Sequence, residues 1–134
     1  MRRIPRGAWV MVADGTSARI FISLGTEDGQ TRLRQEESIV LDPAEGEMPG
    51  VLPTETTAQE AEEQSFARQL AQRLNQDALA GRYDCLVLTA DPQTLGQIRP
   101  LLHDEVRSRM HAELAKNYTN LRLEQIEQAL APDF

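Results

Sequence analysis

The sequence predicts an α+β domain in which helices pack on one mixed, five-stranded sheet. Two observations carry this prediction. Three strand-like segments separated by Asp-Gly turns lie within the first 41 residues, and the second half alternates between apolar runs and segments with helical periodicity. A chain of 134 residues can bury an adequate core without disulfides or metals, so we expect a single domain over residues 1–134.

The first strand is expected at residues 8–13. This run is continuously apolar, which is typical of a central strand covered on both faces, so Trp9 should be largely buried. Asp14 and Gly15 follow as a hairpin signal, because a tight primed turn requires positive φ and glycine tolerates it. The chain should therefore turn directly after residue 13.

The second and third strands are predicted from alternation. Ala18, Ile20, Ile22 and Leu24 fall on one face of the second strand. Gly25 and the pair Asp28 and Gly29 are read as turn residues. After them, one face of a third strand carries Leu33, Ile39 and Leu41. Its other face is rich in charge, which suits a sheet edge, and the three strands form an antiparallel meander.

Residues 42–56 show no periodicity and are rich in Pro, Gly and acidic residues. Loops of this length inside a compact domain are usually functional or disordered, so we expect a mobile loop that contacts a partner. The candidate interaction residues in this loop are Glu45, Gly46, Glu47, Met48 and Gly50.

A long helix is expected next, opened by the capping box of Thr57 and Glu60 and ended by Gly81. Tyr83–Ala90 is a short apolar run that should pair in parallel with the first strand. Asp91 and Pro92 are typical of a helix start.

The remaining elements complete the fold. Pro100 should shorten the helix that begins at Pro92, and Met110–Ala115 reads as a last, edge strand. A closing helix carries Leu123, Ile126 and Leu130, with its cap at Thr119 or Asn120. The order βββαβαβα is that of the ribonuclease-H-like fold, with a core over residues 8–131.

Composition excludes several classes of function. The 14 basic and 21 acidic residues give a net charge of −7, which argues against general nucleic-acid binding and against docking on an anionic membrane. The single cysteine, Cys85, cannot form an intrachain disulfide and fits a reducing compartment. No apolar run approaches the ~18 residues of a membrane span, and no signal peptide is present, so we expect a cytoplasmic protein.

Several segments together resemble a family of bacterial host attachment proteins. Residues 9–21 follow the pattern W-hydrophobic-x-V-A-D-x-x-x-A-R-I-F with which that family opens. Further similar segments are Phe66–Ala71, Tyr83–Leu88, Leu95–Gly96, Glu113–Asn120 and Glu124–Glu127. The resemblance covers about residues 8–131 and implies a protein required for attachment to host cells.

That family is similar in turn to the middle domain of archaeal and eukaryotic class I release factors, which implies a ribonuclease-H-like core. In those factors a Gly-Gly-Gln loop, between the third strand and the first long helix, helps water attack the peptidyl-tRNA ester. Here residues 42–56 contain no Gly-Gly-Gln, and their carboxylates would be repelled by ribosomal RNA. The triplet Asp28, Gly29 and Gln30 is explained by a hairpin turn. We therefore expect no peptidyl-tRNA hydrolysis.

Metal-dependent hydrolysis is a further alternative. Two-metal sites need several acids brought together, and Asp14, Glu62 or Glu63, and Asp91 are the available set. Each also fits a plain structural role: a turn residue, residues on a solvated helix face, and an N-cap.

Nucleophilic catalysis has weaker support. Cys85 lies inside an apolar run, where a thiol usually acts as a small hydrophobe, and the spacing of His103 and His111 matches no metal site. We expect no catalytic residue, no cofactor and no metal.

The function predicted from sequence is therefore a non-enzymatic binding protein of the host attachment family, similar to release-factor middle domains. The alternative is a ribosome-associated translation or rescue factor, and a metal-dependent nuclease is a third reading. A protein or the ribosome is the expected partner, and the oligomeric state stays open.

Overall fold

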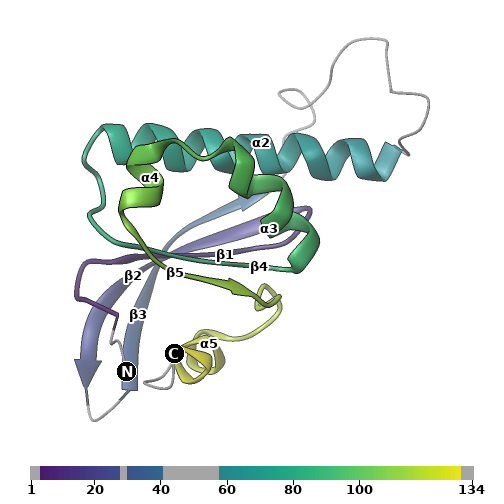
Figure 1. Ribbon diagram of the computed structural model, residues 1–134. Coiled ribbons are helices and arrows are strands. Elements are labelled where there is room, and N and C mark those ends of the chain that lie inside the picture. The colour runs from purple at the N-terminus through teal and green to yellow at the C-terminus, as the bar shows by residue number, and fades with distance from the viewer. Residues whose placement is uncertain (1–3, 28–29, 41–57, 131–134) are drawn as a thin grey trace.

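The computed structural model describes residues 4–27, 30–40 and 58–130. Within them the chain forms a five-stranded sheet with helices on both faces (Figure 1). The strand order across the sheet is β3-β2-β1-β4-β5. The strands are β1 (Trp9–Ala13), β2 (Ser17–Glu27), β3 (Gln30–Val40), β4 (Leu86–Ala90) and β5 (Met110–Ala115).

The strand pairing is that of the ribonuclease-H-like fold, as predicted. β1, β2 and β3 form the antiparallel meander. β4 pairs in parallel with β1, and its register runs from Trp9–Leu86 to Ala13–Ala90. β5 pairs in parallel with β4 and lies at the sheet edge. The mixed sheet with packed helices confirms the α+β class.

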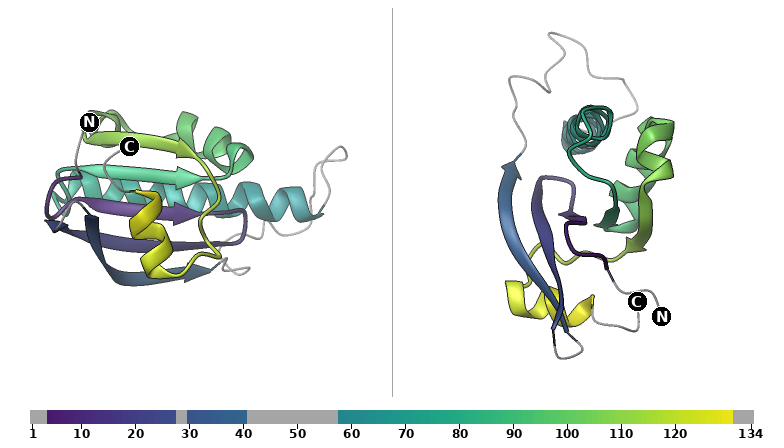
Figure 2. Two further views of the ribbon diagram at one scale, coloured as in Figure 1. Left: turned by 90° about the horizontal axis from the view of Figure 1, so that it is seen from below. Right: turned by 90° about the vertical axis from the view of Figure 1, so that its left-hand side faces the viewer.

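Helices cover the two faces of the sheet unequally. α2 (Ala58–Leu79), α3 (Pro92–Ile98) and α4 (Asp104–Ser108) pack on one face, and α5 (Leu123–Ala129) packs on the other (Figure 2). α2 ends near Gly81, whose φ of 71° is the left-handed conformation expected there. α3 ends at Ile98, and a 3₁₀ turn, η1 (Arg99–Leu101), contains Pro100, so the predicted shortening is confirmed.

Two hydrophobic cores result, one on each side of the sheet. The larger core lies under α2, where Phe66, Leu70 and Leu74 meet sheet residues such as Met11 and Leu88. The smaller core joins Val10, Val12, Phe21, Leu33 and Val87 of the sheet to Ile126 and Leu130. Of the helices in the described ranges, none is both long and apolar enough to cross a bilayer.

The start of β4 differs from the prediction. The strand begins at Leu86 rather than at Tyr83, because the preceding residues turn away to bury the Tyr83 ring. Trp9 packs on that ring with the centroids 5.0 Å apart, and it is partly buried. Trp9 is therefore less fully buried than Val10, Met11 and Val12, which follow it in β1.

The predicted face of β3 is wrong because the strand is irregular. Ile20 pairs with Glu37 and Phe21 with Gln35, so Glu36 is an extra residue. One extra residue reverses the alternation, which places Ile39 against the larger core and Leu33 in the smaller one. Leu41 lies outside the described residues.

Gly25 is likewise a strand residue rather than a turn residue. It lies in β2 beside a second register shift, and its φ of +98° explains why glycine occurs there. Leu24, the residue without a partner at that shift, is 46% exposed although the alternation predicts it on an apolar face.

Two helix predictions also need correction. α4 was not predicted, because it spans only five residues and buries a single apolar side chain, that of Val106. α5 begins at Leu123 with Arg122 as N-cap, rather than at Thr119 or Asn120. Thr119 is instead held by contacts with the first hairpin, which the next section describes.

Candidate functional site

Four strands, β1, β3, β4 and β5, have their C-terminal ends on the same side of the sheet, and we call this side the carboxyl edge. The residues that follow β1, β4 and β5 there are Asp14, Asp91 and Lys116. The register pairs Ala13 with Ala90 and Ala90 with Ala115, so these strands end side by side (Figure 2). β3 ends there too, because Val40 pairs with Ser17 at the start of β2. In open sheets of this kind, ligands favour the carboxyl ends of parallel strands.

Asp14 is the centre of a hydrogen-bond network at the carboxyl edge. Its Oδ1 accepts from the main-chain N–H groups of Thr16 and Ser17, both at 2.8 Å. The hydroxyls of the same two residues donate to it at 3.2 and 3.3 Å. Asp14 Oδ2 lies 2.7 Å from Thr119 Oγ1, which comes from 105 positions away. Both carboxylate oxygens are therefore used inside the protein.

The hairpin after β1 forms as predicted, but by a different mechanism. Gly15 does not have a positive φ; among the residues that the structure describes, the glycines with positive φ are Gly7, Gly25 and Gly81. The turn is closed instead by the Asp14 carboxylate and by a hydrogen bond from Asp14 N to Ser17 O at 2.9 Å. An Asp side chain that accepts from the N–H groups of the next residues replaces the primed turn.

Arg19 fixes the C-terminal segment to the same edge. Its Nη1 donates to the main-chain oxygen of Leu121 at 2.6 Å, and Nε and Nη2 donate to Gln35 Oε1 at 3.1 and 3.0 Å. The guanidinium lies 4.9 Å from the centroid of the Phe21 ring, a favourable cation–π distance. β2, β3 and the residues before α5 are joined by this one side chain.

The electrostatics of Asp14 follow from these contacts. Burial alone would raise its pKa, but the hydrogen bonds from Thr16, Thr119 and Ser17 outweigh burial and hold the pKa below its ordinary value. The ionised carboxylate is therefore the form that the network stabilises at neutral pH.

Asp91 is the second acid at the carboxyl edge. It acts as the predicted N-cap, because its Oδ2 accepts from Thr94 N at 3.2 Å. Its Oδ1 is buried and has no hydrogen-bond partner within the part of the chain that the structure describes. Within residues 4–27, 30–40 and 58–130, no three His, Cys, Asp or Glu side chains are placed to hold a metal ion. Asp14 and Asp91 thus occupy neighbouring strand ends while each serves a local turn.

The predicted interaction loop cannot be placed. Glu45, Gly46, Glu47, Met48 and Gly50 all lie outside the described residues. What the structure does establish is where the segment leaves the sheet, since Val40 ends β3 at the carboxyl edge.

The structure describes only some of the remaining residues that the sequence analysis singled out. Glu27 pairs with Gln30, so β2 and β3 form the predicted hairpin, while Asp28 and Gly29 between them lie outside the described residues. The side chains of Glu62 and Glu63 also lie outside them, so the structure does not test the metal set of Asp14, Glu62 or Glu63, and Asp91.

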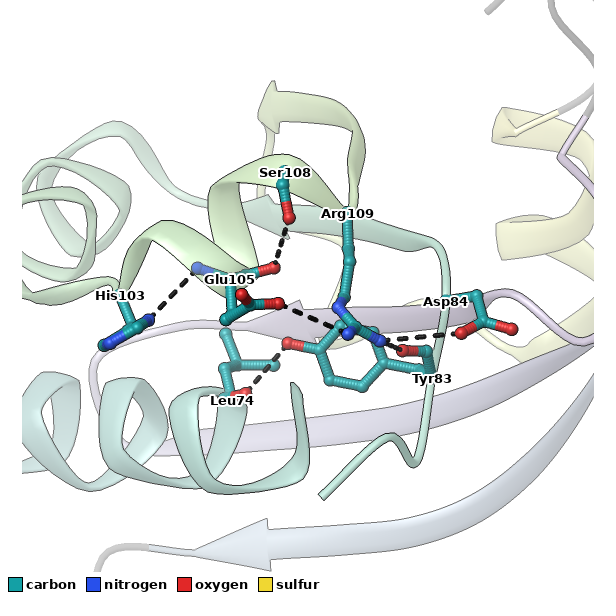
Figure 3. A network of polar contacts seen from close by, with 7 residues as sticks. All are labelled: Leu74, Tyr83, Asp84, His103, Glu105, Ser108 and Arg109. Atoms are coloured by element: carbon teal, nitrogen blue, oxygen red, sulfur yellow. Dashed lines mark hydrogen bonds and ion pairs between the residues drawn. The ribbon is translucent and has the colours of Figure 1, made fainter. Parts of the chain in front are cut away.

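A second polar network lies at the opposite end of β4, and we call it the amino edge; its residues are Tyr83, Asp84, Glu105 and Arg109 (Figure 3). Arg109 Nη1 donates to Tyr83 O at 2.6 Å, and its Nη2 lies 3.3 Å from Glu105 Oε2. Tyr83 donates its hydroxyl proton to the main-chain oxygen of Leu74 at 2.8 Å. Burial, followed by the charge of Asp77, raises the pKa of that hydroxyl. This network joins α2, α4 and β4.

The remaining reactive side chains have structural surroundings. Cys85 precedes β4 and is partly buried, and burial raises the pKa of its thiol, which disfavours the nucleophilic thiolate. His103 is the N-cap of α4 and accepts from Glu105 N at 3.1 Å. Arg99 pairs with Glu113 at 2.8 Å. His103 thus caps a helix, and Arg99 joins η1 to β5.

Sequence reasoning gave no role to Arg19 or Glu127, and it assigned Thr119 only as a possible helix cap. Glu127 is 8% exposed, and its Oε2 accepts from the main-chain N–H of Leu33 at 2.7 Å, which fixes α5 against β3. All three residues lie in the segments quoted for the family resemblance, and that was the only signal available.

Comparison with solved structures gives remote neighbours. An archaeal protein matches 91% of this chain at 13% identity with a TM-score of 0.49, and the match covers 32% of that protein. A RuvC structure from Thermus thermophilus matches 78% of this chain at 11% identity with a TM-score of 0.39, and the match covers 60% of that protein. The chain thus spans less than two thirds of either structure. A search of curated proteins found no match.

Comparison with family models is more decisive. The model of bacterial archaeo-eukaryotic release factor family 12 matches residues 7–130, nearly the whole chain. The match confirms the similarity to release factors that the sequence predicted, and it does not confirm the similarity to host attachment proteins. The chain belongs to bacterial archaeo-eukaryotic release factor family 12.

Proposed function

We propose that this member of release factor family 12 is a non-enzymatic binding protein, derived from a translation factor, whose partner contacts the carboxyl edge. The family match supports the origin in translation. The position of the edge supports the binding surface, because four strand ends meet there and residues 41–57 leave the sheet beside them.

The observation that carries the non-enzymatic proposal is the use of Asp14 inside the fold. A catalytic carboxylate at a strand end needs lone pairs that remain available to a metal ion or a water molecule. In Asp14, Oδ1 accepts from Thr16 and Ser17 and Oδ2 accepts from Thr119, so the fold takes up much of the acceptor capacity of this carboxylate, and Asp91 Oδ2 caps α3. The 134 residues also contain no Gly-Gly pair with which to build a release-factor loop.

Charge distribution favours a basic protein surface as the partner. Nine acidic residues and no Lys, Arg or His lie between residues 36 and 63, whereas the rest of the chain carries 14 basic and 12 acidic residues. A segment with this charge repels the phosphates of RNA and attracts Lys and Arg side chains. The partner group that fits is therefore a cationic segment of another protein.

Peptide release from ribosome complexes tests the non-enzymatic part of the proposal. The purified protein is added to ribosomes carrying labelled peptidyl-tRNA, together with the variants Gln30→Ala and Gln128→Ala. We expect no release above background from any of them. Release that disappears in Gln30→Ala but persists in Gln128→Ala, a change on the exposed side of α5, would contradict the proposal.

Ribosome association is the second candidate, and the family match is the observation that favours it. Co-sedimentation with ribosomes at moderate salt tests it, using Asn120→Glu at the carboxyl edge and Gln76→Glu on the exposed face of α2 as the matched control. Binding that is weakened only by Asn120→Glu would identify the ribosome as the partner. Attachment to host cells, which the sequence resemblance implies, would then be an indirect consequence of such binding.

A further inference from the structure

The two outer strands of the sheet, β3 on one side and β5 on the other, differ in how their free backbone edges are protected. A free strand edge presents unpaired N–H and C=O groups, and proteins usually cover or charge such edges. At the β3 edge, the main-chain N–H of Leu33 donates to the Glu127 carboxylate, and α5 packs beside it. The same strand carries charges at Arg32, Arg34, Glu36 and Glu37.

The β5 edge has much weaker protection. In the described part of the chain, β5 is hydrogen-bonded to β4 on one side and to no strand on the other. Its charged residue Glu113 points to the face of the sheet that α2, α3 and α4 cover, where its carboxylate pairs with the Arg99 guanidinium at 2.8 Å. Ala112 and Leu114 lie on the opposite face and are only partly buried.

The apolar surface beside β5 is only partly covered. Cys85, Leu114 and Tyr118 pack against the smaller core, but none of them is buried. α5 covers the other half of the same face, over Leu33 and Phe21. A partner that continued the sheet past β5 would extend the cover over Leu114.

The register of β5 limits how a partner can pair. Leu86 pairs with Met110 and Val87 with Ala112, so His111 is an extra residue and the regular part of β5 starts at Ala112. Two copies related by a two-fold axis at Leu114 would pair antiparallel over residues 112–116. Leu114 would then face Leu114 of the other copy, and Ala112 would face Lys116, with no like charges opposed.

We propose that two copies of this chain associate through β5, forming one continuous sheet with a two-fold axis at Leu114. Charge supports a second copy as the occupant of this edge. Glu36 and Glu37 lie on β3, at the opposite side of the sheet from β5, so pairing through β5 keeps these carboxylates of the two copies far apart. The contact is small, so the dimer is expected to be weak and concentration-dependent.

Disulfide trapping tests the register. In a Cys85→Ser background, Leu114→Cys would oppose itself, and we expect it to cross-link about tenfold faster than Ser38→Cys on the protected β3 edge. Ala112→Cys and Lys116→Cys should cross-link when mixed but not when each is alone. Lys116 is exposed, so this pair does not depend on the tolerance of Leu114 to substitution.

Sedimentation tests the dimer without added cysteines. The mass of the unmodified chain should rise from 15.0 kDa toward twice that value with increasing concentration. Leu114→Lys opposes two ammonium groups and should stay at 15.0 kDa with an unchanged circular dichroism spectrum. A 15.0 kDa species at every concentration, or cross-linking no faster than in Ser38→Cys, would overturn the proposal.

Discussion

The two ends of the sheet are both held by an arginine that donates to a main-chain oxygen, yet the surroundings of the two arginines differ. At the amino edge Arg109 reaches Tyr83, 26 positions away, and the tyrosine ring is buried against Trp9 (Figure 3). At the carboxyl edge Arg19 reaches Leu121, 102 positions away. Asp14 and Thr119 join the same two distant segments beside it.

The difference separates a packing network from a candidate binding surface. At the amino edge, hydrogen bonds attach helices to the Trp9–Tyr83 ring pair, so the polar groups there stabilise the packing of the larger core. The carboxyl edge joins strand ends to the segment before α5 and leaves Thr16, Lys116 and Asn117 exposed. A polar network alone does not mark a site; we propose the carboxyl edge because four strands end there.

Truncation at the amino edge should have the largest effect on stability. Trp9→Ala removes the ring that packs on Tyr83, and we expect a loss of about 3 kcal/mol in the free energy of unfolding, because Trp9 is only partly buried. Urea denaturation measures it. A loss below about 1 kcal/mol would show that the aromatic pair contributes little to the core.

Removal of the carboxylate at the carboxyl edge should have a smaller effect. Asp14→Ala leaves the N–H groups of Thr16 and Ser17 without their side-chain acceptor and removes one of the two acceptors near the Thr119 hydroxyl, and should cost about 2 kcal/mol. Thr119→Val in the same denaturation assay separates the long-range contact from the turn. Equal stability of Asp14→Ala and the unmodified chain would remove the network from the account.

The contributions of the carboxyl edge and the amino edge to stability should also differ in their dependence on pH. The pKa of Asp14 is lowered in the folded chain, so its ionised form stabilises the fold above the unfolded-state pKa, and this contribution is lost as the pH falls through the folded-state pKa. The stability difference between the unmodified chain and Asp14→Asn should therefore be largest near neutrality and shrink below the ordinary pKa of 3.8. Trp9→Ala, which removes no charge, serves as the control. A difference that does not change with pH would argue against an ionised Asp14 in the network.

The smallest effect is expected for the tyrosine hydroxyl. Tyr83→Phe keeps the buried ring but removes the hydrogen bond to Leu74, which should cost about 1 kcal/mol. Calorimetry can resolve this change. A much larger loss would indicate that the hydroxyl, rather than the ring, organises the amino edge.

Local signals predicted most of the fold. The hairpin at Asp14, the cap at Asp91 and the helix end at Gly81 depend on neighbouring residues, and the structure contains each of them. The parallel pairing of β4 with β1 followed from the order of elements. By contrast, the face of Ile39 could not be predicted, since an extra residue at Glu36 changes the alternation without a local signal.

The carboxyl edge could be predicted only in part. Asp14 and Asp91 were identified as strand-end acids, but the contact of Asp14 with Thr119 requires two segments to be brought together by packing. Local patterns do not report such contacts. The same reason applies to Glu127. No local pattern shows that its side chain is buried and accepts a hydrogen bond from the main-chain N–H of Leu33 on β3.

The most direct test of the central claim is a magnesium titration followed in ¹⁵N–¹H spectra of the labelled protein. We propose that Asp14 and Asp91 serve the fold rather than a catalytic metal. We therefore predict that the amide signals of Thr16, Ser17 and Thr94 do not move as Mg²⁺ is raised through the millimolar range. A saturable shift of these three signals that is abolished by Asp14→Asn would contradict the non-enzymatic account.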